Sequence, residues 1–218
     1  MFQAVVFDLD GTLLDTLQDL ADAANDALRK AGLPTHPTAA FRRYVGNGID
    51  KLIERVLPPP LRQDAFLKKR LTEDFNAYYA AHKEDHTRSY PGMGPLLAKV
   101  RDAGIKTGVV SNKPAAYVPV ITGQYFPGLI DISIGLPDGA PPKPDPAGLQ
   151  HALKALGASA SCTLYVGDSD VDVETAHRVP GVLCCGALWG FRGREELAAA
   201  GADFLAADAA ELETLIFR

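Results

Sequence analysis

The 218-residue sequence has few cysteines and no long apolar run, and each shortage excludes a class of protein. Its three cysteines, Cys162, Cys184 and Cys185, are odd in number and show neither CxxC nor Cys/His spacing. This disfavours a disulfide scaffold and a zinc site, and it predicts buried, reduced thiols. No stretch approaches the roughly 18 apolar residues that span a membrane, so we expect a soluble protein with no membrane partner.

Clustered positive charge is also missing. The chain has 22 basic and 27 acidic residues, and no Lys/Arg block forms the kind of patch that binds nucleic acid. We therefore expect no nucleic-acid partner, and an anionic substrate would have to be held by local cations. The first residues, "MFQAVVFD", lack the basic region, longer apolar stretch and cleavage site of a secretory signal, which predicts a cytoplasmic protein.

After residue 90, short β-rich runs alternate with helical stretches. This alternation, with near-continuous apolar strands, predicts an α/β, Rossmann-like core in which a parallel sheet carries helices on both faces. The expected strands are residues 4–7, 105–111, 131–135, 163–168, 182–188 and 202–206, and the clearest helices are 145–156, 170–178 and 208–216.

Residues 17–83 interrupt this rhythm, because they hold helical patterns and no convincing strand. We expect an inserted α-helical cap domain, residues 16–88, and a catalytic core made of residues 1–15 and 89–218. The second border carries the Pro and Gly that are common where a chain re-enters a core.

The stretch "FDLDGT" places Asp8 and Asp10 at the end of the first apolar strand. Side chains two residues apart on a strand share a face, so the two carboxylates repel each other and require a cation or a proton. A β-hairpin turn at Asp-Gly is the structural alternative, but a helical pattern follows instead of a return strand. An EF-hand is excluded, because the glycine lies at the fourth position from Asp8 instead of the sixth.

Polar residues also follow the later strands: Ser111 and Asn112, then Lys143 in a proline-rich loop, then Asp168 and Asp172. Taken singly, each has a structural explanation, namely a helix cap or a solvated loop lysine. Parallel strands bring their carboxyl ends to one rim, however, so together these residues predict a site that binds an anion and a hard cation.

The four motifs together resemble those of the haloacid dehalogenase-like hydrolase superfamily: "DLDGT" at 8–12, Ser111, Lys143 in "KPDP", and "GDSDVD" at 167–172. The resemblance implies that Asp8 is a nucleophile that forms an aspartyl-phosphate and that Asp10 is the general acid and base. An acid at position 10 favours phosphoryl transfer over dehalogenation.

The resemblance also implies the ligands of the cofactor and the substrate. Asp8 and Asp168 by side chain and Asp10 by its carbonyl would hold Mg²⁺, with Asp172 as a ligand through water or as support. The phosphoryl group would be bound by Leu9, Asp10, Ser111, Asn112 and Lys143, and Lys143 would also stabilise Asp8.

The helical insert resembles the mobile cap of the phosphoglycolate phosphatase-like and β-phosphoglucomutase-like group. This implies hinges near residues 14–16 and 88–92 and a substrate loop of Gly46, Asn47 and Gly48. "LWGF" at 188–191 resembles a late "WG" segment of phosphoglycolate phosphatases, although Trp189 could equally be a core residue. The cap offers several cations for specificity that the sequence does not rank: Arg42, Arg43, Lys51, Arg55 and Arg70.

We therefore expect a Mg²⁺-dependent phosphomonoesterase for a small phosphorylated metabolite, with 2-phosphoglycolate as the first candidate. The alternatives are a phosphosugar phosphatase and a β-phosphoglucomutase-like mutase. Phosphonatase chemistry would require a Schiff base on Lys51. A non-catalytic phosphometabolite-binding protein is a further alternative, and it would be expected to lack a residue of at least one of the four motifs. The chain is expected to be a monomer or a homodimer.

Overall fold

The computed structural model describes residues 2–218, and the chain divides into two compact units. One unit is built from the residues up to Leu14 together with Ser89–Arg218, and the other is Asp15–Arg88. The chain leaves the first unit through β2 (Leu14–Asp15) and returns through β3 (Arg88–Ser89), and these two short strands pair with each other. Within residues 2–218, no helix is both long and apolar enough to cross a membrane.

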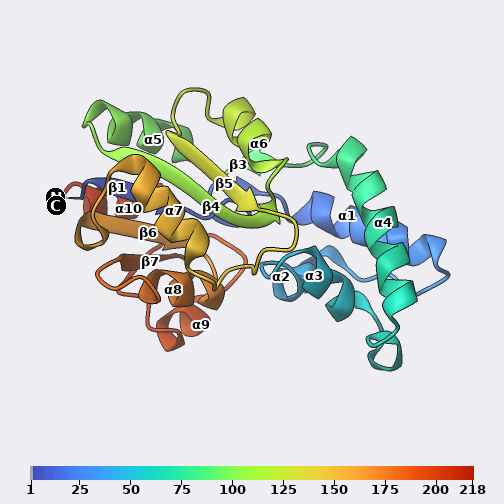
Figure 1. Cartoon of the computed structure of the whole chain (residues 1–218). Helices are drawn as coiled ribbons and strands as arrows, with labels where there is room; N and C mark the ends of the chain where they lie inside the picture. The colour runs from blue at the N-terminus through green and yellow to red at the C-terminus, as the bar shows by residue number, and fades with distance from the viewer. Residues whose placement is uncertain (1) are drawn as a thin grey trace. The chain divides into compact units, whose positions relative to one another are not determined.

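The first unit contains a parallel sheet with the strand order β5-β4-β1-β6-β7-β8 (Figure 1). The prediction of an α/β core is therefore confirmed. Its strands are β1 (Ala4–Phe7), β4 (Lys106–Pro114), β5 (Ile132–Leu136), β6 (Thr163–Gly167), β7 (Leu183–Ala187) and β8 (Phe204–Ala206), with the short 3-10 helix η2 (Ala160–Cys162) before β6.

Successive side chains of the central strand point to opposite faces of the sheet, as strand geometry requires. Val5 and Phe7 join one buried cluster, whereas Val6 joins another. Burial on both faces explains why the strands read as unbroken apolar runs. One face is covered by α5 (Met93–Asp102), α6 (Val118–Tyr125) and α10 (Ala209–Ile216), and the other by α7 (Ala147–Leu156), α8 (Asp170–His177) and α9 (Arg194–Ala199).

One predicted strand end is wrong. The sequence predicted a strand over residues 105–111, with Ser111 and Asn112 as possible helix caps, but β4 continues to Pro114 and α6 begins only at Val118. The pairing register with β5 shifts between Val110 and Pro114, so the strand is irregular there instead of ending. The irregular segment leaves the Val110 carbonyl available to side chains of the site.

The second unit is helical. Its elements are α1 (Leu17–Lys30), α2 (Thr38–Tyr44), α3 (Ile49–Val56), the 3-10 helix η1 (Pro59–Leu61) and α4 (Ala65–His82). Helices α1 and α4 pack against each other (Figure 1). Buried aromatic and aliphatic side chains, including Phe41, Leu71 and Phe75, give this unit its own core.

A buried carboxylate ties the beginning of the second unit to its end. Asp19 on α1 is only 2% exposed. One of its oxygens accepts a hydrogen bond from the His86 N-H (2.9 Å), and the other accepts bonds from the N-H (2.8 Å) and the hydroxyl (2.7 Å) of Thr87. A buried carboxylate with three donors fixes the segment that leaves α4 against α1.

We predict that Asp19→Ala lowers the free energy of unfolding by about 3 kcal/mol, because it removes the acceptor of the buried Thr87 N-H and hydroxyl and of the partly buried His86 N-H. Urea denaturation followed by circular dichroism measures the loss. Glu73→Ala, an exposed acid on α4, is the matched control and should change stability by no more than about 0.5 kcal/mol. Equal effects of the two variants would contradict this account of Asp19.

Candidate active site

Three strands deliver polar side chains to one rim of the sheet. Phe7, the last residue of β1, pairs with Val109 of β4 and with Val166 of β6. The next residue, Asp8, donates its N-H to the Val166 carbonyl at 2.8 Å. Because the strands are parallel and in register, the residues that follow them meet at their carboxyl ends, which is where open α/β sheets hold their ligands.

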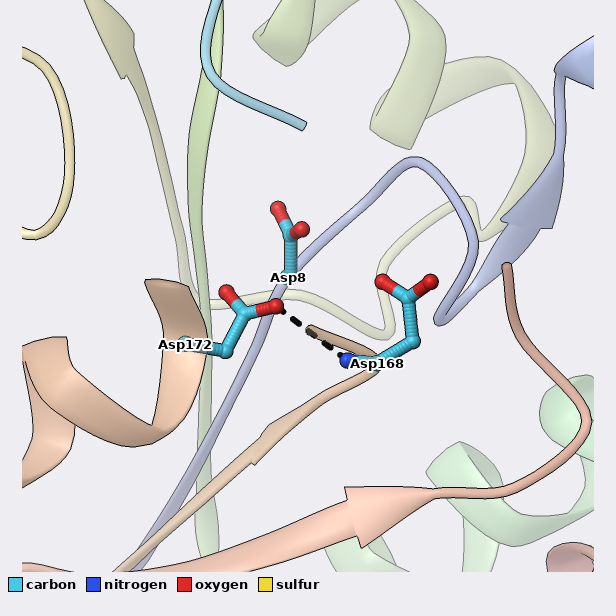
Figure 2. Close-up of side chains that lie close together, drawn as sticks. All are labelled: Asp8, Asp168 and Asp172. Carbon is cyan, nitrogen blue, oxygen red and sulfur yellow. Dashed lines mark hydrogen bonds between the residues drawn. The ribbon is translucent and has the colours of Figure 1, made fainter. Parts of the chain in front are cut away.

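Asp8, Asp168 and Asp172 form a buried acidic cluster at this rim. Each contributes a carboxylate oxygen, and these oxygens all lie within 4.8 Å of one another. Figure 2 shows that Asp8 follows β1, Asp168 follows β6 and Asp172 projects from α8 toward them. The sequence motifs at 8–12 and 167–172 are thus brought together in space.

The ammonium of Lys143 lies between two of these carboxylates. It is 2.9 Å from Oδ1 of Asp8 and 2.7 Å from Oδ1 of Asp172, and it donates to the Val110 carbonyl at 3.1 Å. Burial by itself lowers the pKa of Lys143, but the attraction of Asp172 and Asp8 outweighs it and holds this pKa well above its usual value. Lys143 is therefore stabilised as a cation, and its contact with Asp8 positions that carboxylate.

Asp172 uses both of its oxygens within the protein. Oδ2 accepts hydrogen bonds from the Asp168 N-H (3.2 Å) and from the N-H (3.1 Å) and hydroxyl (2.6 Å) of Ser169, which forms a capping box at the start of α8. Oδ1 faces Lys143. Asp172 thus caps α8 and also contributes to the site. Because both of its oxygens already accept hydrogen bonds from the protein, the geometry favours a role in positioning Lys143 and Asp168 over direct ligation of a metal.

The Asp168 side chain is enclosed by the loops after β1 and β7. Its Oδ2 accepts the Phe191 N-H at 2.7 Å, and Oδ1 lies 3.4 Å from the Thr12 hydroxyl. A Cβ atom on Gly11 or on Gly190 would collide with the Asp168 side chain, so both positions require glycine. Gly11 also has a φ of 88°, which permits the turn after β1.

The protein alone does not compensate the charge of this site. Burial raises the pKa of Asp8 to about 7 in spite of Lys143, and burial together with Asp172 and Asp8 raises the pKa of Asp168 well above its usual value. A hard divalent cation would remove this cost, because Mg²⁺ prefers oxygen ligands and carboxylates. The arrangement of Asp8 and Asp168 fits such an ion.

The two residues of β4 predicted to bind phosphate differ in their surroundings. The Ser111 hydroxyl accepts the Lys113 N-H at 3.2 Å. The Asn112 side chain instead exchanges two hydrogen bonds with the main chain of Lys143, at 2.7 and 3.2 Å. Asn112 therefore positions the loop of Lys143, and its direct contact with phosphate stays a prediction.

Two further residues of the site were not singled out from the sequence. Lys113 lies with its ammonium 2.8 and 3.1 Å from the two carboxylate oxygens of Asp10. The Tyr165 hydroxyl, from the middle of β6, lies 3.0 Å from the Lys143 ammonium. The position of Lys113 directly after Ser111 and Asn112 is a sequence signal that could have pointed to it.

The late "LWGF" segment reaches the same rim. The indole N-H of Trp189 donates to the Thr12 carbonyl at 2.9 Å, and the Phe191 N-H holds Asp168. The segment therefore links the first and last motifs.

The predicted substrate loop belongs to the other unit. Gly46, Asn47 and Gly48 precede α3, and Gly48 is its N-cap with a φ of 84°. Among the candidate cations, Lys51 forms an exposed ion pair with Glu54, and Arg55 donates to the Tyr44 carbonyl. The roles of these residues in binding a substrate stay predictions.

A buried lysine and an acidic cluster at the carboxyl ends of a parallel sheet form, in this α/β protein, a site suited to an anion and a divalent cation. Residues 5–185 match the family of haloacid dehalogenase-like hydrolases. The chain belongs to this family, as its motifs had indicated.

Known proteins and a solved structure resemble this chain over nearly its whole length. The phosphoglycolate phosphatases of Yersinia pseudotuberculosis and Vibrio cholerae are 35% and 36% identical to it, over 96% and 94% of this chain and 91% and 92% of theirs. A crystal structure from Lactobacillus delbrueckii subsp. bulgaricus matches with a TM-score of 0.92 and 30% identity, covering 99% of this chain and 98% of that one.

We predict that Mg²⁺ raises the melting temperature and that Asp168→Asn abolishes this rise. An ion at 100 times its Kd stabilises a protein by about 2.7 kcal/mol. In chelator, Asp168→Asn should melt no lower than the unchanged protein, because it removes a buried charge. Asp170→Asn, an exposed acid of the same motif, is the control that keeps the Mg²⁺ response. Loss of the response in both variants would argue against Asp168 as a specific ligand.

Proposed function

We propose that this protein is a Mg²⁺-dependent phosphomonoesterase that hydrolyses 2-phosphoglycolate through an aspartyl-phosphate on Asp8. The observation that carries the proposal is the buried Asp8 carboxylate, fixed by Lys143 beside Asp168 at the rim of the sheet. The phosphoglycolate phosphatases that resemble this chain over more than nine-tenths of its length support the choice of substrate.

Asp8 is oriented for nucleophilic attack. Its Oδ1 accepts the Leu9 N-H at 2.7 Å and faces Lys143, so we assign Oδ2 to the attack on phosphorus. A bond forms between Oδ2 and phosphorus while the bond from phosphorus to the alcohol oxygen breaks. Asp10 donates a proton to the departing alcohol oxygen.

The second step returns the enzyme to its starting state. Asp10 accepts a proton from water, the water oxygen attacks phosphorus, and the bond between phosphorus and Asp8 breaks. Inorganic phosphate leaves and the Asp8 carboxylate is restored. Using one residue as acid and then as base balances the protons over the cycle.

The residues of the rim divide the remaining tasks. The side chains of Asp8 and Asp168 and the Asp10 carbonyl would hold Mg²⁺, with Asp172 supporting the site. The ion would reduce the repulsion between the nucleophile and the anionic ester. Ser111 and Lys143 bind the transferring phosphoryl group, and the Asn112 side chain keeps Lys143 in place.

We assign the helical unit Asp15–Arg88 the role of a cap that excludes water and selects the substrate. In this proposal, the loop of Gly46, Asn47 and Gly48 meets the substrate, and the chain bends at residues 14–16 and 88–92.

We predict that Asp8→Asn lowers kcat for phosphate release at least about 10⁴-fold, because it removes the nucleophile. Acid quenching during turnover of phosphorus-32-labelled 2-phosphoglycolate should label the unchanged protein, and hydroxylamine should remove that label. Asp170→Asn should behave like the unchanged protein. Turnover by Asp8→Asn at the normal rate would refute the nucleophile assignment, and isomerisation of a phosphosugar without phosphate release would indicate a mutase.

A further inference from the structure

Lys113 places a second buried ammonium at the site. Its side chain is 3% exposed, that of Asp10 is 18% exposed, and its Nζ contacts both oxygens of the Asp10 carboxylate, at 2.8 and 3.1 Å. Lys143 is separately engaged with Asp8 and Asp172. Lys113 therefore pairs with Asp10, whereas Lys143 pairs with Asp8 and Asp172.

Stability alone does not account for a lysine at this position. Taking an ammonium out of water carries a large desolvation cost, and its attraction to a carboxylate often does no more than offset that cost. Apolar residues of similar size are frequently as stabilising as a buried ion pair. A cation buried against Asp10 is better explained by an anion that must be held beside Asp10.

The proposed chemistry defines where such an anion would be. Asp10 must come within hydrogen-bond distance of the alcohol oxygen that leaves phosphorus. In 2-phosphoglycolate this oxygen is bonded to a CH₂ group that carries the carboxylate, so the carboxylate carbon is two bonds from the leaving oxygen. An ammonium in contact with Asp10 is therefore within reach of the substrate carboxylate.

We propose that Lys113 binds the carboxylate of the substrate and thereby selects phosphate esters of α-hydroxy acids. This inference rests on the proposed function and names a residue that determines its specificity. The substrate carboxylate takes over one of the two contacts that Lys113 makes with Asp10. Without the lysine, the substrate carboxylate and Asp10 would repel each other at close range.

The exchange also affects the acid. While both Asp10 oxygens face Lys113, neither is fully directed to a leaving oxygen. When the substrate carboxylate replaces one contact, one Asp10 oxygen can turn toward the alcohol oxygen. A phosphate ester without a carboxylate cannot cause this exchange, so selection acts on kcat as well as on KM.

The test compares 2-phosphoglycolate with its carboxamide, 2-phosphoglycolamide, which has nearly the same shape but no negative charge beside the ester. Phosphate release with Mg²⁺ gives kcat/KM for both esters with the unchanged protein, Lys113→Met and Lys106→Met. Lys106 begins the same strand and is exposed, so Lys106→Met is a matched control for loss of a lysine from β4. Circular dichroism and the Mg²⁺-dependent rise in melting temperature verify the fold of each variant.

We expect the unchanged protein and Lys106→Met to prefer 2-phosphoglycolate, and Lys113→Met to lose this preference by about 10- to 100-fold, as for a charge-assisted hydrogen bond. An equal loss for both esters in Lys113→Met would overturn the inference, because it would mean that Lys113 only positions Asp10. A preference that survives in Lys113→Met would also overturn it.

The unchanged protein separates this inference from the proposed function, even if Lys113→Met does not fold. Equal turnover of the two esters by the unchanged protein would overturn the role of Lys113 and leave the phosphatase in place. Turnover of neither ester, nor of any other phosphate ester, would overturn the proposed function itself. Preference of the unchanged protein for 2-phosphoglycolate supports the proposed function, and loss of that preference in Lys113→Met supports the role of Lys113.

Discussion

The site depends on the ammonium of Lys143, which is buried between Asp8 and Asp172 at 2.9 and 2.7 Å. Two carboxylates this close would repel each other strongly in a buried setting, and one would be forced to take a proton. The lysine keeps them together and fixes the nucleophile. Its own placement requires the irregular end of β4, the Tyr165 hydroxyl and the two hydrogen bonds of Asn112.

The negative charge of Asp8 and Asp168 that the lysines do not compensate indicates a need for a cation at the site. Asp168 accepts a hydrogen bond from a backbone N-H and lies against Gly11 and Gly190, but the ion pairs of Lys113 and Lys143 that the structure shows within residues 2–218 go to Asp10, Asp8 and Asp172. Its pKa and that of Asp8 are raised because burial is not fully compensated. A divalent cation would complete the balance of charge, and this need links metal binding to the fold of the loops that carry Asp8 and Asp168.

The sequence predicted the sheet, most of its strands and the acidic residues of the site, because apolar runs followed by Asp8 or Asp168 mark the carboxyl ends of buried strands. It did not predict the partners of these residues. Lys113 contacts Asp10 across 103 positions of the chain, and Tyr165 lies hidden in an apolar strand, so only the fold reveals either contact. The end of β4 was misplaced because Ser and Asn before a proline are typical of a helix start.

A crystal structure grown with Mn²⁺ and beryllium trifluoride, with data collected at the manganese absorption edge, tests the central claim most directly. We predict an anomalous peak within coordination distance of the Asp8 and Asp168 carboxylates and the Asp10 carbonyl, with beryllium trifluoride on Asp8 and in contact with Lys143. A manganese ion ligated directly by Asp172 in place of Asp168, or beryllium trifluoride bound away from Asp8, would contradict the account.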